Sequence, residues 1–497
     1  MSASVAPPRF APHALVAVIV AAFGLRVLVA YGMPNLVWPD EVFQSQEQAH
    51  RLVFGYGIIP WEFREGARSW MVPGFLALVM QVTSWFASSP AAYLTTCAAA
   101  LSAISLAPVW GALRLGVREA GTRGAIVAGG VVAMWFELVY FAPKALSEVV
   151  AGNLLALGVV LSALRERTEI SSRRMIVIAA VLALAAMLRV QLAPAALLTF
   201  VLVVRPVPRT QQWAALITAG AVVLAAGLLD WITWSYPFQS YVENIRINIV
   251  EGKSAAYGVA GWTAYFEVYG RIWGPWAVPV LALAVVGARR APLIALAAAL
   301  VLIVHLPIAH KEYRFAYPAL VLVVLLAGLG TATCVRWIGD RATPRMATLA
   351  TIGVLVAWAS VSLRLANDFH GEQTQLATSA AEQLHWERRR GGLLAMQRLG
   401  EEPALCGVAI VGIGLANTGG YTWLHRDVPI YVLPDARAML EKGALFNGAV
   451  LPAATDDAYG AFVRSACWAE ACVFTRPGAC ATVPGYHINR MLERRGL

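Results

Sequence analysis

Charged side chains are scarce in this chain of 497 residues. Asp, Glu, Lys and Arg together make up 14% of the residues, while hydrophobic residues make up 59%. A soluble domain usually has about 25% charged residues. Long apolar runs recur from Ala11 to Leu365, and runs of this length are typical of membrane-spanning helices. The shortage of charge therefore excludes an ordinary soluble protein and predicts an all-α polytopic membrane protein.

The sequence also lacks a basic region of the kind that binds nucleic acid. Its net charge is +10, but the basic residues are spread over short connections between apolar runs. The connections in question are 114–123, 165–174, 205–210, 287–292 and 336–345. The positive-inside rule places all five in the cytoplasm. The opposite face then receives residues 32–90, 143–146, 189–191, 235–271, 307–314 and 365–497.

The apolar runs predict about 11–12 membrane segments. The expected spans lie near residues 11–31, 91–113, 124–142, 147–164, 175–188, 192–204, 212–234, 272–288, 291–306, 315–335 and 346–364. Residues 71–87 are apolar enough to enter the membrane, but a full crossing there would invert every later loop. We therefore expect a re-entrant or half-embedded helix at 71–87.

The sequence lacks the signs of a cleaved signal peptide and of a transporter repeat. No A-x-A cleavage site follows the first apolar run, and Arg26 interrupts that run, so we interpret it as a retained span and not a signal peptide. No internal repeat of transporter type is evident, which disfavours a carrier.

Cysteine is rare, and its distribution is uneven. Cys97 and Cys334 lie in apolar runs, where cysteine usually serves as a small apolar residue. The other four, Cys406, Cys467, Cys472 and Cys480, follow the last span. An even set in a terminal domain predicts disulfides in an oxidising space. A zinc site is the alternative, although the usual C-x2-C spacing is missing.

Residues 365–497 differ in character from the rest of the chain. The charge rises, and apolar runs shorten to strand length at 408–414, 428–434 and 468–474, with Gly and Pro between them. This pattern predicts a small C-terminal α/β domain on the non-cytoplasmic side. We therefore expect a transmembrane domain over 1–364, with a first outer loop at 32–90, and a second domain over 365–497.

The densest polar stretch before residue 235 runs from Trp38 to Trp70 and contains the adjacent acids Asp40 and Glu41. An ionised group at the bilayer centre costs roughly 2.5–3.5 kcal/mol, so such a pair belongs at an aqueous face and is a functional candidate. A simpler interpretation is that Asp40 caps a helix and Glu41 occupies its first turn. A carboxylate pair could also hold a divalent ion.

Other polar residues gather in the outer loops, and their chemistry suits an anionic headgroup. The sequence places Lys144 and Glu148 in one loop, Arg189 and Gln191 just before Pro194 in another, and AHKEYRF (309–315) in a third. Lys and Arg neutralise phosphate, and a carboxylate can take a proton from an attacking hydroxyl. Taken singly, Lys144 and Arg314 could instead extend to the membrane surface, and the aromatic rings of 235–271 could form an interfacial belt.

Four motifs of the sequence resemble those of a known family. The first comprises WPDEVFQSQEQAHRLVFGYGIIPWEF and RSWMVPGF, and the second is AHKEYRFAYP. They resemble the first lumenal loop and the HKE-x-RF-x-x-P motif of glycosyltransferase family 22, the α-mannosyltransferases of GPI-anchor and N-glycan assembly. YVENIRINIVEGKSAAYG and GGYTWLHRDVPIY resemble two further motifs, and all four occur in the family's order between residues 38 and 434. Trp38, where the family often has His, and APKALSE at 142–148 depart from the pattern.

The resemblance implies a GT-C fold, an active site on the extracytoplasmic face, and a polyprenyl-phosphate sugar, usually mannose, as the donor. Asp40 matches the family's catalytic aspartate, with Glu41 beside it as a second catalytic candidate. Lys311 and Arg314 match the basic residues of the HKE-x-RF motif and are expected to bind the donor phosphate, with Arg189 and Lys144 as further candidates. The expected substrate-binding residues are Gln44, Arg68, Trp70, Gln191, Asn248, Tyr257, His310 and Glu312.

The sequence thus predicts an inverting, membrane-bound mannosyltransferase that acts on a glycan or glycolipid acceptor, with the lipid bilayer and the polyprenyl-phosphate donor as its other partners. No metal is required, because the leaving phosphate is already charged, although a divalent cation remains an option. The Ala- and Arg-rich composition suggests a bacterial plasma membrane. The alternative is a transporter or flippase that binds the lipid-linked sugar without chemistry.

Overall fold

The computed structural model describes residues 12–164, 171–371, 383–453 and 456–496. The chain forms two compact units. Unit 1 contains Met1–Val29, Ala99–Phe238 and Ile245–Glu382, and unit 2 contains Ala30–Ala98, Gln239–Asn244 and Gln383–Leu497. These units describe packing and not membrane position, so the division between 1–364 and 365–497 stays a prediction.

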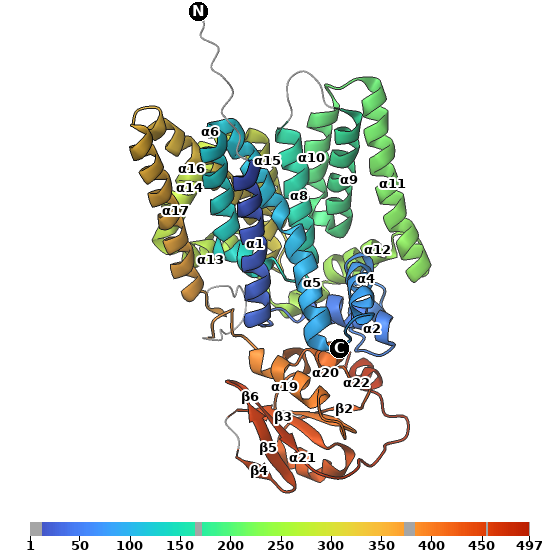
Figure 1. Cartoon of the computed structure of the whole chain (residues 1–497). Helices are drawn as coiled ribbons and strands as arrows, with labels where there is room; N and C mark the ends of the chain where they lie inside the picture. The colour runs from blue at the N-terminus through green and yellow to red at the C-terminus, as the bar shows by residue number, and fades with distance from the viewer. Residues whose placement is uncertain (1–11, 165–170, 372–382, 454–455, 497) are drawn as a thin grey trace, which may run out of the picture. The chain divides into compact units, whose positions relative to one another are not determined.

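Unit 1 is a bundle of apolar helices, in which α8, α9, α10 and α11 run side by side (Figure 1). Its helices are α1 (Pro12–Gly32), α5 (Pro90–Ile104), α6 (Leu106–Met134), α7 (Phe136–Phe141), α8 (Ser147–Ala163), α9 (Ser172–Leu188), α10 (Ala193–Val204), α11 (Arg209–Thr233), α13 (Ala264–Trp273), α14 (Ala277–Arg290), α15 (Pro292–His305), α16 (Tyr317–Gly339) and α17 (Pro344–Asn367). The last residues of α1, from Ala30, and the first part of α5, up to Ala98, belong to unit 2.

Six helical stretches in the described part of the chain are long and apolar enough to cross a membrane, and four shorter apolar helices accompany them. A helix lies at each of the eleven predicted spans, which confirms that these stretches are helical; that all eleven cross the membrane stays a prediction. Residue 11 and residues 165–170 of the second basic connection lie outside the described residues. Helix α4 (Met71–Ser84) has 14 residues. It is about 21 Å long, against a hydrocarbon core of roughly 30 Å, which fits a segment too short to cross.

Helix α6 is two helices joined by a sharp turn. Ala120 and Gly121 have non-helical backbone angles, and Gly121 has a φ of 59°. The two arms touch at Gly116 and Gly124, since a Cβ on Gly116 would lie 2.3 Å from the carbonyl oxygen of Gly124. Only glycine allows backbones to approach this closely. The turn falls inside the predicted basic connection 114–123 and separates the two predicted spans on either side.

Unit 2 combines the first loop with the C-terminal domain. The loop forms a π-helix, η1 (Glu41–Gln46), followed by α2 (Glu47–Phe54), α3 (Trp61–Arg64) and α4. A short helix, α12 (Gln239–Ile245), also belongs largely to this unit. The domain carries α19 (Arg390–Gly400), α20 (Gly420–Leu424), α21 (Ala436–Glu441) and α22 (Ile488–Arg494) around one sheet.

The sheet has six strands in the order β2-β1-β3-β6-β5-β4. They are β1 (Val408–Val411), β2 (Ile430–Leu433), β3 (Gly448–Pro452), β4 (Ala458–Tyr459), β5 (Phe462–Cys467) and β6 (Ala471–Thr475). β2, β1 and β3 are parallel, whereas β6 and β5 are antiparallel to their neighbours. Helices α19 and α20 cover one face and α21 the other (Figure 1). The predicted C-terminal α/β domain is therefore confirmed.

The four cysteines of this domain form two disulfides, Cys406–Cys480 and Cys467–Cys472. Cys467–Cys472 joins the facing ends of β5 and β6. Cys406–Cys480 closes a loop of 74 residues and connects the segment before β1 to the segment after β6. The prediction of disulfides is confirmed, and the zinc alternative is wrong because every candidate thiolate is used in a disulfide.

Candidate functional site

The basic residues of unit 1 form a buried ionic cluster around Arg314. This residue lies in η6 (Tyr313–Ala316), a 3-10 turn that leads directly into α16. Its Nε and Nη2 donate to the two carboxylate oxygens of Glu312 at 2.7 and 3.0 Å, and its Nη1 lies 3.0 Å from Glu148 at the start of α8. Arg189, at the end of α9, lies 4.0 Å from the same Glu148. Both guanidinium groups also lie against the ring of Phe315.

Lys311 and His310 connect this cluster to the loop before α13. Lys311 is buried, and its Nζ donates to the carbonyls of Ile308 and Ala260. The backbone N–H of Ala260 in turn donates to Ala309. The cluster therefore holds the guanidinium groups of Arg189 and Arg314 against the carboxylates of Glu148 and Glu312, and the buried Lys311 adds a third cation in the same connection as Glu312. This excess of positive charge favours an anion.

Both ring nitrogens of His310 face acceptors. Nδ1 lies 2.8 Å from the carbonyl oxygen of Gly258, and Nε2 lies 3.2 Å from Oε1 of Glu312. Only the imidazolium can donate in both directions. The hydrogen bond to Glu312 raises the pKa of His310 above its ordinary value, although burial opposes the shift. Burial by itself would raise the pKa of Glu312, but Arg314 and His310 together hold it well below its usual range.

This pairing predicts a pH dependence. Because the pKa of His310 is raised in the folded protein, its charged form stabilises the folded cluster. This stabilisation is fully present below the unfolded pKa of about 6.5 and is lost as the pH rises through the folded pKa. If the cluster binds an anionic donor, His310→Gln should increase the donor KM at low pH and have little effect at high pH. Steady-state rates of both proteins across pH 5.5–9 measure this. A ratio of KM values that is constant with pH would contradict the prediction.

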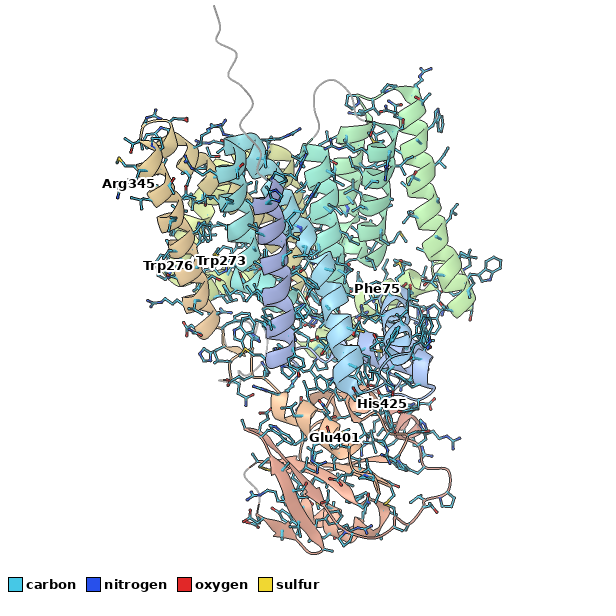
Figure 2. The ribbon with its side chains drawn as sticks, viewed as in Figure 1. Phe75, Trp273, Trp276, Arg345, Glu401 and His425 are labelled. Carbon is cyan, nitrogen blue, oxygen red and sulfur yellow. A yellow bond between two sulfur atoms is a disulfide. The ribbon has the colours of Figure 1, made fainter. Side chains whose placement is uncertain are left out.

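A second buried carboxylate, Glu137, lies beside this cluster in unit 1. It accepts the indole N–H groups of Trp135 and Trp273 at 2.6 and 2.9 Å and the hydroxyl of Tyr313. Trp273 lies among the helices of the unit (Figure 2). Because Tyr313 stands between Glu312 and Arg314, Glu137 fixes the turn that carries both. The sequence analysis missed Glu137; a lone acid in the apolar run MWFELVY was its signal.

The other predicted residues of unit 1 lie in the same loops. Lys144 is buried, with its Nζ over the ring of Tyr140 at 5.2 Å. Gln191 lies in η2 (Val190–Leu192), the turn between α9 and α10. Asn248 lies in a second π-helix, η3 (Arg246–Val250), and its carbonyl accepts the hydroxyl of Ser254. The ring of Tyr257 lies 6.3 Å from that of His310.

In unit 2, Asp40 and Glu41 open the π-helix η1. Asp40 is the residue before the helix, is half-buried, and makes no capping hydrogen bond with its side chain, while Glu41 is buried. The capping interpretation of Asp40 is therefore wrong. π-helical turns are rare and occur frequently at functional sites. Asp40 and Gln44 therefore belong to the same short π-helical segment.

Glu62, which the sequence analysis did not single out, is an acidic partner of this element. Nε2 of Gln44 donates to Glu62 at 2.8 Å. Burial raises the pKa of Glu62, Arg68 lowers it, and the charge of Asp40 raises it. Trp70 packs edge-on against Phe63, and Arg51 lies over its ring at 5.4 Å. Asp40, Gln44 and Arg68 thus all interact with Glu62 in the first loop, and Trp70 lies in the same loop against Phe63 and Arg51.

The predicted site residues therefore fall into two groups, one within each unit. Unit 1 brings together Glu148, Arg189, His310, Lys311, Glu312 and Arg314, and unit 2 brings together Asp40, Gln44, Arg68 and Trp70. That the two groups serve one active site stays a prediction. In the described residues, no group of three or more His, Cys, Asp or Glu side chains is arranged to hold a metal ion.

Solved structures identify the class of fold. The chain is similar to ArnT from Cupriavidus metallidurans bound to undecaprenyl phosphate, with a TM-score of 0.60 over 95% of this chain and 100% of that chain, at 12% sequence identity. ArnT from the same organism in the apo state gives a TM-score of 0.53 over 92% of this chain and 97% of that chain, also at 12% identity. Together with the membrane helices, this likeness defines an integral membrane protein with the GT-C glycosyltransferase fold.

The family follows from the sequence. Residues 17–389 match the model of the Alg9-like mannosyltransferase family, and the chain belongs to this family. It is 26% identical to GPI mannosyltransferase 3 of Yarrowia lipolytica over 449 residues, which cover 84% of this chain and 76% of the relative. It is 23% identical to GPI alpha-1,2-mannosyltransferase 3 of Xenopus laevis over 342 residues, or 64% of this chain and 60% of the relative. The resemblance noted in the motifs is confirmed.

Proposed function

We propose that this protein transfers a mannosyl group from a polyprenyl-phosphate donor to a hydroxyl of a glycan or glycolipid acceptor, with inversion at the anomeric carbon. The family supports a mannosyltransferase. A solved protein of the same fold is titled as bound to undecaprenyl phosphate, which supports a lipid phosphate as the donor's carrier.

One observation carries the proposal: the excess positive charge at Lys311, Arg189 and Arg314. In the reaction, the bond between the anomeric carbon and the phosphate oxygen breaks, and negative charge develops on the departing polyprenyl phosphate. Preorganised cations beside that oxygen stabilise the transition state more than the ground state. Glu148 and Glu312 hold the two guanidinium groups in place, and Lys144 adds a further cation in the α7–α8 connection.

Asp40 is the proposed base. Its carboxylate takes the proton of the acceptor hydroxyl as the hydroxyl oxygen forms the new bond to the anomeric carbon, and the phosphate leaves from the opposite side. A single displacement of this kind inverts a β-linked donor to an α-mannoside. The leaving phosphate is already ionised, so the step needs neither an acid nor a metal.

We further propose that the active site lies on the extracytoplasmic face. Two features support this. The basic connections predict that face for residues 32–90 and 307–314 under the positive-inside rule, and the two disulfides of the C-terminal domain are typical of an oxidising compartment.

The decisive experiment incubates the purified protein with polyprenyl-phosphate mannose and candidate lipid-linked acceptors. Mass spectrometry and NMR of the product should show one added hexose in an α-linkage. A β-linked product would contradict inversion. The transporter alternative predicts no product from the wild-type protein, together with movement of the labelled donor across the bilayer of reconstituted vesicles.

The proposal also requires that Asp40 and Lys311 share one pocket. In a Cys97→Ala, Cys334→Ala background, Asp40→Cys and Lys311→Cys should be joined by a short bifunctional thiol reagent, and the cross-link should appear as a linked peptide in mass spectrometry. Asp40→Cys paired with Arg345→Cys, a residue of a predicted cytoplasmic connection, is the matched control. Equal cross-linking of the two pairs would overturn the shared pocket.

A further inference from the structure

Within unit 2, a single buried carboxylate joins the first loop to the C-terminal domain. Glu47 begins α2, directly after the π-helix, and is fully buried. Its Oε1 accepts the backbone N–H groups of Ile58 and Tyr421 at 2.8 and 3.0 Å. Its Oε2 accepts the N–H and the hydroxyl of Thr422 at 2.8 and 2.5 Å. A buried carboxylate is tolerated only with such partners, so α2 and residues 421–422 hold each other in one arrangement.

The backbone around residue 420 is shaped for this contact. Gly419 and Gly420 have φ values of 75° and 59°, a conformation that favours glycine. A Cβ on Gly420 would lie 3.0 Å from both carboxylate oxygens of Glu47. At the other end of α20, Nδ1 of His425 lies 3.1 Å from Nε2 of His50 (Figure 2 labels His425). Chiefly because of burial, the pKa of His50 is lowered to about 3, so its imidazole is neutral at physiological pH.

Two more sets of contacts hold the segment on either side of Asp40. Before it, the N–H of Leu36 donates to Arg388 at 2.9 Å, Arg389 donates to the carbonyl of Val37 at 3.0 Å, and the ring of Trp38 stacks on His385. After α2, Asn489 accepts the N–H of Ile59 and donates to the carbonyl of Gly57, both at 2.9 Å.

The π-helix itself contributes to the core of the C-terminal domain. Val42 and Phe43 belong to the same buried cluster as Leu393 and Met396 of α19 and Val408 of β1. The element that begins at Asp40 is thus built partly from apolar contacts with the sheet domain. On the same element, the side chain of Gln44 donates to Glu62.

We propose that the C-terminal residues 385–389, 420–425 and 489 position Asp40 for catalysis, and that Thr422 and Asn489 are positioning residues for the reaction. The inference deepens the proposed function, because it rests on Asp40 as the base. Catalysis by a base is sensitive to geometry, and a displacement of about 1 Å can cost about 100-fold in rate. The C-terminal domain would then be part of the catalytic machinery and not only a scaffold.

The first test is Thr422→Val in the full-length protein, which removes the hydroxyl to Glu47 and keeps the shape. We expect kcat to fall about tenfold or more, with the donor KM changed less than about twofold. Thr422→Ser should restore kcat, because it returns the hydroxyl. The matched control is Thr418→Val. Thr418 is equally buried, but its hydroxyl donates to Leu415 within the domain, so kcat should stay within about twofold of wild type.

A second pair covers the case in which Thr422→Val does not fold. Asn489→Ala removes two hydrogen bonds to residues 57 and 59, whereas Asn447→Ala removes two comparable bonds, to Cys406 and Ala404, that lie wholly inside the domain. Asn489→Ala should lower kcat about fivefold or more, roughly the loss of two hydrogen bonds. Asn447→Ala should lower the unfolding temperature at least as much and leave kcat nearly unchanged.

The outcomes separate this inference from the proposed function. If each variant and its matched control lose kcat in equal proportion, the domain contacts only stabilise the fold and the inference is overturned. If Asp40→Asn keeps full turnover, the proposed base is wrong, whatever Thr422→Val does. Turnover that depends on Asp40 and falls selectively with Thr422→Val or Asn489→Ala supports both.

Discussion

Asp40→Asn should reduce mannosyl transfer by about 10²–10⁴-fold, the usual range for loss of a general base. The amide keeps the size of the carboxylate but cannot accept the proton of the acceptor hydroxyl. Binding of the donor should be preserved, because the proposed phosphate contacts lie in Lys311, Arg189 and Arg314. Single-turnover rates with radiolabelled donor, together with donor binding by equilibrium filtration, measure the two quantities separately.

The matched control for this substitution is Glu65→Gln. Glu65 lies in the same first loop and is exposed, so the same change from acid to amide should alter turnover less than about twofold. Loss of donor binding in Asp40→Asn would show that the residue supports structure and not proton transfer. Residual activity in Asp40→Asn that vanishes in Asp40→Asn/Glu62→Gln would identify Glu62 as a substitute base.

Arg314→Gln should have the second-largest effect. The guanidinium of Arg314 contacts both Glu148 and Glu312, and its side chain is 5% exposed. Its removal leaves Glu148 with Arg189, 4.0 Å away, and Glu312 with His310. Breaking a buried pair in this way typically costs 3–5 kcal/mol. We expect transfer to fall about 100-fold or more, by analogy with the loss of one preorganised donor at a charged transition state.

The control for Arg314→Gln is Arg246→Gln. Arg246 also pairs with an acid, Glu251, but both side chains are about half exposed, and exposed pairs contribute little. The two variants are compared by turnover and by the temperature of unfolding in detergent. A double variant, Arg314→Gln/Glu312→Gln, should recover stability without recovering transfer. Recovery of transfer would contradict a direct role for Arg314 at the donor phosphate.

The membrane helices could be predicted from the sequence because a continuous apolar run of span length has few other folded forms. The turn inside α6 was also predictable, since VREAGTR interrupts the run with charge and glycine. In the sheet, β1, β2 and β6 were predicted from apolar runs, but β3, β4 and β5 were missed. Their residues are small or alternate with polar ones, and their pairing partners are not visible in a single run.

The site could be predicted less completely, for a physical reason. Lys311 and Arg314 stood out because charge beside an apolar helix is costly and needs an explanation. Glu62 and Glu47 resembled ordinary acids, since what distinguishes each is its partners in space, whereas Glu137 had a signal in its apolar run that the sequence analysis missed. The partners of Glu47 at Thr422 are 375 residues away in the chain, and no local pattern encodes that contact.

The bond between Glu47 and Thr422 also has a consequence for biosynthesis. A ribosome that adds about 5–20 residues per second needs on the order of 20–75 seconds to travel from one partner to the other. During that interval the carboxylate of Glu47 has no internal donors from the sheet domain and must remain hydrated. If the C-terminal domain positions Asp40 as we propose, transfer would begin only after the last quarter of the polypeptide had emerged.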